Sequence, residues 1–121
     1  MQIGLYANTH GVGYRDNDHN YTRSVPAENL EPVAIAQTAE RNGFHSIWFP
    51  DHVCMPAETK SAHIANKSGA RSYSPRHEML DGAVVMGAVA SSTTRIKLGT
   101  SVLVAPYRAP LSDARQFATV D

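Results

Sequence analysis

The stretch SIWFPDHVCMP, residues 46–56, decides the fold of this chain, because a short apolar run ends there abruptly at an acid and an imidazole. The run contains β-branched and aromatic residues, a composition typical of a buried β-strand. Asp51 and His52 follow the run after a single proline. The stretch therefore predicts a strand that delivers two polar, titratable side chains at its carboxyl end.

The residues before this stretch predict a first β/α unit. QIGLYAN, residues 2–8, has the composition of a buried strand, and the Gly- and Asn-rich residues 9–24 are typical of a loop. In NLEPVAIAQTAERNGF the apolar residues then lie on one broad helical face. Pro32 is tolerated only in a first turn, so this helix should begin close to Leu30. Gly43 lies where a helix end favours a positive φ.

The second half of the chain repeats this alternation. EMLDGAVVMGAVASSTT, residues 78–94, has apolar residues at helical spacing and ends in a Ser and Thr cluster. RIKLGTSVLVAP, residues 95–106, predicts a third strand. The residues expected to share one face of that strand are Ile96, Leu98, Thr100, Val102 and Val104. Pro110 is suited to a first helical turn, so a last helix should begin there.

Strands that alternate with helices predict an α/β fold of about three parallel β/α units. Periodicity leaves open whether the sheet is open or closed into a barrel. In both architectures, ligands bind at the carboxyl ends of the parallel strands. Asp51 and His52 lie at such an end, which makes them the first candidates for a functional site.

Strand-end position alone does not make Asp51 functional, because Asp is also a common turn residue. His52 strengthens the functional interpretation, since an imidazole titrates near neutral pH and an adjacent acid can orient it for proton transfer. The other histidines are interpreted differently: His10, His19, His45 and His63 as solvated surface, and His77 as a residue that precedes a helix. Glu78 is expected to be a first-turn acid favoured by the helix dipole.

Two other motifs are interpreted as structural. GVGYRD, residues 11–16, begins like a dinucleotide-binding loop, but Asp16 occupies the place of the third glycine, so a plain loop is expected. A metal site formed by Asp51, His52 and His77 is not expected either, because no strand carries a paired His-x-His spacing. Cys54 is predicted to be a small packed residue.

Composition excludes several classes of protein. The chain has 121 residues, enough for one ordinary domain, and its eleven basic and eleven acidic residues give a net charge of zero. Such a balance argues against a nucleic-acid or membrane partner. The sequence begins without the basic region of a secretory signal, and its single cysteine cannot form an intrachain disulfide. A cytoplasmic setting is therefore expected.

Two long segments together resemble a known family, the luciferase-like monooxygenases and their relatives that use the deazaflavin coenzyme F420. The first is AERNGFHSIWFPDH, residues 39–52, and the second runs from LDGAVVMGAV through TRIKLGTSVLVAPYRAP to the last residue, residues 80–121. The resemblance implies a TIM (β/α)8 barrel, which needs about 250 residues. Residues 1–121 are thus expected to form the N-terminal part of such a barrel.

The resemblance also implies a site. His52 matches the family's active-site histidine, and Asp51 matches the acid before it, so both are expected to be catalytic and to contact the cofactor. Thr100, Ser101 and Val102 match the strand end that supports the cofactor ring, where Ser101 and Val102 correspond to a bulge with a non-prolyl cis peptide. The expected cofactor is coenzyme F420, with flavin mononucleotide (FMN) as the alternative. The expected partners are a small-molecule substrate and a second copy of the chain.

Two departures from the family pattern limit the function. Pro50 stands where a small residue is common in the family. The aromatic residue that follows the Asp-His pair in the sugar-phosphate dehydrogenase branch is absent, so a sugar-phosphate substrate is not expected.

Lys67, Arg71 and Arg76 are candidates for binding an anionic cofactor tail or substrate, and a solvated loop is the alternative. The two functions left open are a deazaflavin- or flavin-dependent oxidoreductase and a non-catalytic β/α module that binds a ligand.

Overall fold

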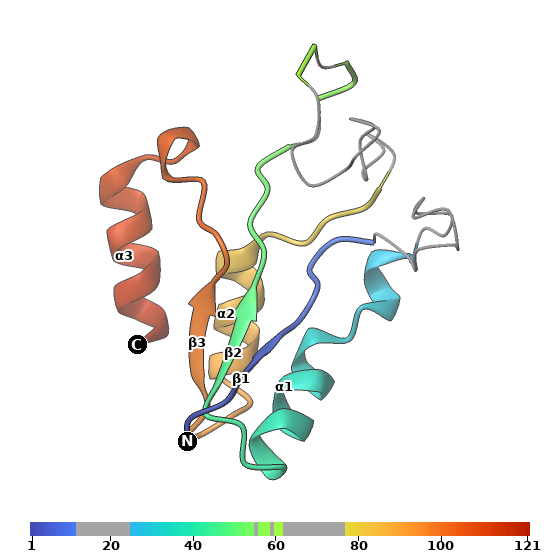
Figure 1. Cartoon of the computed structure of the whole chain (residues 1–121). Helices are drawn as coiled ribbons and strands as arrows, with labels where there is room; N and C mark the ends of the chain where they lie inside the picture. The colour runs from blue at the N-terminus through green and yellow to red at the C-terminus, as the bar shows by residue number, and fades with distance from the viewer. Residues whose placement is uncertain (12–24, 55, 59, 62–76) are drawn as a thin grey trace.

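A computed structural model shows three parallel strands in one sheet with helices packed beside it (Figure 1). The structure describes residues 1–11, 25–54, 56–58, 60–61 and 77–121. The elements, in chain order, are β1 (Gly4–Tyr6), the short 3-10 helix η1 (Ala27–Asn29), α1 (Pro32–Arg41), β2 (Ser46–Phe49), α2 (Gly82–Ala90), β3 (Lys97–Thr100), the 3-10 helix η2 (Ala105–Tyr107) and α3 (Pro110–Val120). This order confirms the predicted α/β class with three parallel β/α units.

The apolar run at residues 46–49 forms β2, the central strand of the sheet. β2 pairs in parallel with β1 on one side and with β3 on the other. Ile47 lies opposite Leu5 of β1 and Leu98 of β3. Because neighbouring side chains along a strand point to opposite faces, these three residues lie on one face and Trp48 lies on the other.

The hydrophobic core lies between the sheet and the first two helices. Ile47 and Phe49 of β2 have no exposed surface, and they belong to one cluster with residues of α1 and α2. The other cluster members are Ala7, Ala36, Ala39, Val85, Met86, Val89 and Ile96. Burial of apolar surface of this kind is the main stabilising term in a fold, at about 25 cal/mol per Å².

The opposite face of the sheet carries an indole that crosses all three strands. Trp48 is 43 % exposed, and its Nε1 donates a hydrogen bond of 3.0 Å to Ser46 Oγ. A Cβ atom added at Gly99 of β3 would lie 2.5 Å from Trp48 Cε3, and one added at Gly4 of β1 would lie 2.9 Å from Trp48 Nε1. Glycine is therefore required on both neighbouring strands for the indole to lie flat.

The helix ends follow the sequence signals closely. Pro32 is the first residue of α1, two residues after the expected start, and Pro110 is the first residue of α3 as predicted. Gly43 follows α1 with a φ of 80°, which confirms its place after a helix end. Asp81 caps α2, because its carboxylate accepts hydrogen bonds from the backbone N–H groups of Ala83 and Val84.

The third strand is shorter than predicted. β3 ends at Thr100, the peptide bond between Ser101 and Val102 is cis, and Val102 is 72 % exposed. Ser101 N still donates to Phe49 O at 2.8 Å, but the chain leaves the sheet after this bond. The expected alternation of residues through Val104 is therefore wrong, because a period of two holds only while the backbone stays in the ladder.

A single carboxylate ties α1 to the start of β3. Glu40 Oε1 accepts hydrogen bonds from the backbone N–H groups of Thr94, Arg95 and Ile96, at 2.9, 2.6 and 2.9 Å. These three bonds lower the pKa of the Glu40 carboxyl, because each of them favours its charged form. The clamp fixes the loop that enters β3 at the end of the sheet opposite to Asp51.

Of the helices described, none is long and apolar enough to cross a membrane.

Candidate active site

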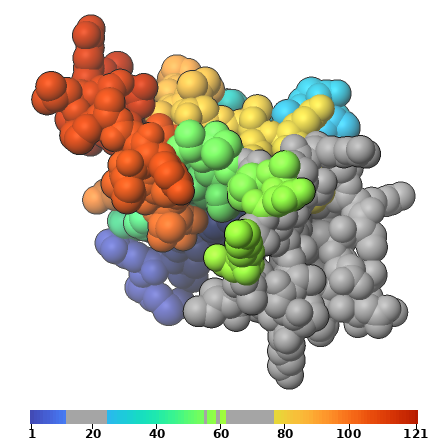
Figure 2. All heavy atoms as spheres, turned by 90° about the horizontal axis from the view of Figure 1, so that it is seen from above, coloured from blue at the N-terminus to red at the C-terminus, as the bar shows by residue number. Residues whose placement is uncertain are grey.

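The carboxyl ends of the three strands lie at one edge of the sheet and bring together residues far apart in the sequence. Seen from this end, the segment after β2 lies beside the segment after β3 (Figure 2). Thr9 and His10 follow β1, Asp51 and His52 follow β2, and Val104 and Arg108 follow β3. The segment that leads into α2 joins them through Asp81.

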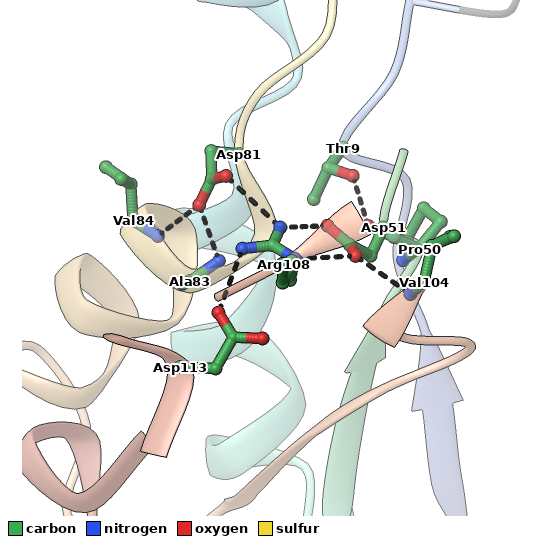
Figure 3. A network of polar contacts seen from close by, with 9 residues as sticks. All are labelled: Thr9, Pro50, Asp51, Asp81, Ala83, Val84, Val104, Arg108 and Asp113. Carbon is green, nitrogen blue, oxygen red and sulfur yellow. Dashed lines mark hydrogen bonds and ion pairs between the residues drawn. The ribbon is translucent and has the colours of Figure 1, made fainter. Parts of the chain in front are cut away.

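Asp51 is buried, and both of its carboxylate oxygens accept hydrogen bonds from residues that follow β3 (Figure 3). It is 3 % exposed, and its Oδ2 accepts hydrogen bonds of 3.1 Å from Val104 N and from Arg108 Nε. Arg108 Nη2 donates to the other carboxylate oxygen, Oδ1. The guanidinium thus holds the carboxylate through two parallel bonds, the strongest geometry for such a pair.

Arg108 connects this site to two helices. Its side chain is 11 % exposed, and its Nη2 lies 3.3 Å from Asp81 Oδ2 at the start of α2. Its Nη1 lies 3.6 Å from Asp113 Oδ1 in the first turn of α3. One guanidinium therefore ties the end of β2 to α2 and α3, with three carboxylates around one positive charge.

The ionisation of this pair follows from its contacts. Burial raises the pKa of the Asp51 carboxyl, but the hydrogen bonds from Arg108 and Val104 and the guanidinium charge outweigh burial, so the net pKa is lowered. The same hydrogen bond with Asp51 raises the pKa of Arg108. Both side chains are therefore charged at neutral pH.

His52, next to this ion pair, lies beside a second histidine that the sequence analysis assigned to the surface. His52 is partly exposed, whereas His10 is only 6 % exposed. The ring centroids of the two imidazoles are 6.0 Å apart, with 58° between the ring planes. The prediction of His10 as solvated surface is wrong, because the segment leading into α2 packs on it. His45 is half-buried, which also departs from the predicted solvated surface.

A network of hydrogen bonds, one from the Thr9 side chain and the others between backbone groups, holds the residues after β1 in place. Thr9 Oγ1 donates to Pro50 O at 2.8 Å, and Leu80 N donates to Thr9 O at 2.7 Å. His10 forms an antiparallel bridge with Met79. Gly11 completes this segment, and a Cβ atom there would lie 2.1 Å from Val25 O. The ends of β1 and β2 are thus joined directly, through Thr9 and Pro50.

Two further predictions are corrected by this arrangement. Glu78 does not lie in the first turn of α2, which begins at Gly82; its carboxylate accepts a hydrogen bond of 2.6 Å from Ala27 N, the first residue of η1. The acid therefore serves a different helix start from the one expected. Cys54 is exposed rather than packed, because it lies beyond the strand end.

The residues expected to support a cofactor ring lie beside this network. Thr100 ends β3, and Ser101 and Val102 follow it with the cis peptide that the family resemblance implied. Ser101 and Val102 are exposed and Thr100 is half-buried. All three shortly precede Val104 in the chain, and the N–H of Val104 donates to Asp51.

Sequence reasoning missed Arg108 and His10. The signal for His10 was available, because YANTH ends the first strand as FPDH ends the second. Arg108 gave a weaker signal: it follows a strand in VAPYRAP, but only the fold shows that it turns back to Asp51. Several predictions concern residues outside those that the structure describes. These are His19, His63, residues 12–16 of GVGYRD, Lys67, Arg71 and Arg76. Within the described ranges, no group of three or more His, Cys, Asp or Glu could hold a metal ion.

Comparison with protein families gives a match over almost the whole chain. Residues 4–121 match the family described as luciferase-like monooxygenase. The chain therefore belongs to the luciferase-like monooxygenase family. The search of solved structures gave no significant match.

The curated relatives are mycobacterial. The chain is 30 % identical over 92 residues to "Uncharacterized protein Rv0953c" of Mycobacterium tuberculosis (strain ATCC 25618 / H37Rv), which covers 76 % of this chain and 33 % of that protein. It is 29 % identical over 84 residues to "Uncharacterized protein Rv0940c" of the same strain, with 69 % of this chain and 29 % of that protein covered. The matches thus span about a third of each relative's length.

Proposed function

We propose that the protein to which this chain belongs is an oxidoreductase that transfers a hydride between coenzyme F420 and a small organic substrate. The observation that carries the proposal is a partly exposed histidine, His52, held at the strand ends beside a buried and ion-paired acid, Asp51. Membership of the luciferase-like family supports oxidoreduction with a flavin or a deazaflavin. It also argues against the alternative of a non-catalytic ligand-binding module.

His52 is proposed to move the proton that accompanies hydride transfer. When an alcohol is oxidised, a C–H hydride leaves the carbon and the O–H proton must go to a base, so that a C=O bond can form. A positioned imidazole supplies such a base and typically contributes about 10²- to 10⁴-fold. In the reductive direction the same imidazole donates the proton. His52 is exposed enough to reach a substrate at the strand ends.

Asp51 is proposed to position His52 rather than to move a proton itself. Its carboxylate is buried, accepts three hydrogen bonds and has a lowered pKa, so it remains charged while neighbouring groups titrate. A buried acid locked by Arg108 fixes the backbone from which the next residue projects. Asp51 thus supports the site through the chain, and His52 carries the chemistry.

The residues after β3 fit a planar cofactor ring. Val102 exposes 72 % of its surface at the strand ends, and an apolar side chain there offers contact to one face of an aromatic ring. Thr100 at the end of β3 and Ser101 after it would border the same ring. A bound deazaflavin accepts or donates a hydride at a ring carbon. This chain's residues would hold that ring and keep His52 beside it.

A second candidate is an FMN-dependent monooxygenase, which the description of the matching family favours. It would use the same strand ends and the same His52, so geometry alone does not choose between the two. The difference lies in the cofactor and in the use of oxygen. Anaerobic turnover separates them, because hydride transfer with a deazaflavin needs no oxygen and monooxygenation does.

Substitution of His52 tests the proposal directly. In the intact enzyme, His52→Ala should lower kcat by roughly 10²-fold or more, while cofactor affinity changes less than about tenfold, because the imidazole acts in proton transfer. His45→Ala is the matched control, since His45 precedes the same strand at the opposite end of the sheet. Unchanged turnover in His52→Ala would reduce the Asp-His pair to a strand terminator.

A further inference from the structure

The second histidine at the strand ends has a setting that its sequence position did not predict. His10 is 6 % exposed, although histidine is usually at least partly solvated. Its ring lies beside that of His52, with the centroids 6.0 Å apart. The two imidazoles follow neighbouring strands, β1 and β2, and lie at the end of the sheet where the proposed chemistry takes place.

The backbone on both sides of His10 is fixed. Leu80 N donates to Thr9 O at 2.7 Å, and Gly11 N donates to Glu78 O at 2.8 Å, so the two residues that flank His10 are both bonded to the segment leading into α2. Thr9 is also bonded to Pro50, two residues before His52. Because these hydrogen bonds connect the backbone segments that carry His10 and His52, the fold sets the distance between the two rings.

We propose that His10 is a positioning residue for His52, and that the two imidazoles form a coupled pair which carries no more than one proton while the enzyme works. This inference rests on the proposed function, in which His52 takes up and releases the reaction proton. His10 does not contact the substrate in this account. It acts through His52, as a neutral polar neighbour that favours the imidazolium formed when the proton arrives.

The electrostatics of the pair support this assignment. Burial lowers the pKa of His10, the charge of His52 lowers it further, and His77 adds a smaller effect of the same sign, against a backbone hydrogen bond that raises it. Among the described residues packed around His10, the titratable groups are His52 after β2 and His77 and Glu78 before α2. The Glu78 carboxylate is bonded to Ala27 N. Asp51 is bonded to Arg108.

These charges explain why His10 stays neutral. Two like charges this close repel each other, and burial disfavours the charged form of an imidazole. In this proposal the reaction proton goes to His52, because its ring is the more exposed of the two. A neutral His10 keeps one donor and one acceptor nitrogen, which an apolar residue of similar size lacks.

Nuclear magnetic resonance titration of the histidine rings tests the pair without any cofactor or substrate. In His52→Gln, the titration midpoint of His10 should move to higher pH, because a repelling charge has been removed. His45→Gln is the control and should leave His10 unchanged, since His45 lies at the far end of β2. A His10 midpoint that is the same in wild type and His52→Gln would overturn the proposal.

Turnover of the intact enzyme gives a second, independent readout. His10→Leu should lower kcat by about tenfold with KM changed less than threefold, and His10→Gln should recover most of the loss, because Gln restores a neutral donor and acceptor. Equal loss in both variants would contradict the role, because shape rather than polarity would then matter. If the protein has no oxidoreductase activity, the proposed function fails, while the titration still decides whether the histidines are coupled.

Discussion

Removing the guanidinium of Arg108 should destabilise the fold far more than a surface ion pair would. Asp51 has a side chain that is 1 % exposed. Of the hydrogen bonds that its carboxylate accepts from described residues, Arg108→Met would leave only the one from Val104 N. An uncompensated buried charge of this kind costs about 3 to 5 kcal/mol. Exposed ion pairs contribute only about 0 to 1 kcal/mol. Since a domain is stable by about 5 to 15 kcal/mol, this one substitution should remove a large part of the stability.

The dependence on pH has a definite sign. In the wild type the pKa of Asp51 lies below its ordinary value of 3.8, so its stabilising contribution is present above that value and is lost as the pH falls through the folded-state pKa. In Arg108→Met, burial acts with little to oppose it and should raise the pKa of Asp51. As the pH falls and the Asp51 carboxyl of Arg108→Met takes up a proton, the destabilisation caused by its buried charge is therefore relieved. The stability gap between the two proteins should be widest near neutral pH and should narrow as the pH approaches 3.8 and falls below it.

Urea denaturation followed by circular dichroism measures this gap at each pH. Arg41→Met is the matched control, because Arg41 makes an exposed bond to Thr38 Oγ1 near the end of α1 and should cost little. The double variant Asp51→Asn with Arg108→Met should be more stable than Arg108→Met alone, because it leaves no unpaired buried charge. A loss below about 1 kcal/mol in Arg108→Met, the size of a surface pair, would refute the reasoning, as would a gap that widens on acidification.

Two further predictions concern parts of the fold outside the strand ends. Glu40→Gln should lower the melting temperature at neutral pH, because it removes a charged carboxylate whose pKa is lowered by three backbone hydrogen bonds. The difference from the wild type should shrink as the pH falls below 4.5, the ordinary pKa of a Glu carboxyl. A difference independent of pH would contradict the clamp. Gly99→Val should displace the Trp48 indole, cost about 1 to 3 kcal/mol and shift the tryptophan fluorescence, since its Cβ would lie 2.5 Å from the ring. Gly87→Val is the control for Gly99→Val, because a Cβ added at Gly87 would meet no described atom within 4 Å apart from its own helix backbone and chain neighbours. Equal fluorescence changes in the two variants would rule out the proposed contact.

Local sequence signals predicted most of the fold because they report local constraints. Pro32 and Pro110 mark helix starts since their rings fit only a first turn, and Gly43 marks a helix end since it adopts a positive φ. The apolar run at residues 46–49 correctly predicted the central strand. Val102 and Val104 were the exception, because apolar alternation continues through the sequence after the backbone has left the sheet at Thr100.

The site could be predicted only in part, because its partners are set by the fold. Asp51 and His52 were found from their position at a strand end. Arg108 and His10 reach them across 57 and 42 residues of sequence, and a single sequence carries no record of which distant side chains meet. Their contacts depend on the order of strands in the sheet and on the turn that follows β3.

The most direct test of the central claim is an equilibrium titration of the intact protein with coenzyme F420 and, separately, with FMN. The account predicts that F420 binds at least tenfold tighter, a difference of about 1.4 kcal/mol or more, and that Val102→Glu weakens this binding by a similar factor. Val84→Glu is the control, because Val84 is also 72 % exposed but lies on α2, away from the proposed ring site. FMN binding at least tenfold tighter than F420, or equal effects of the two glutamate substitutions, would contradict the account.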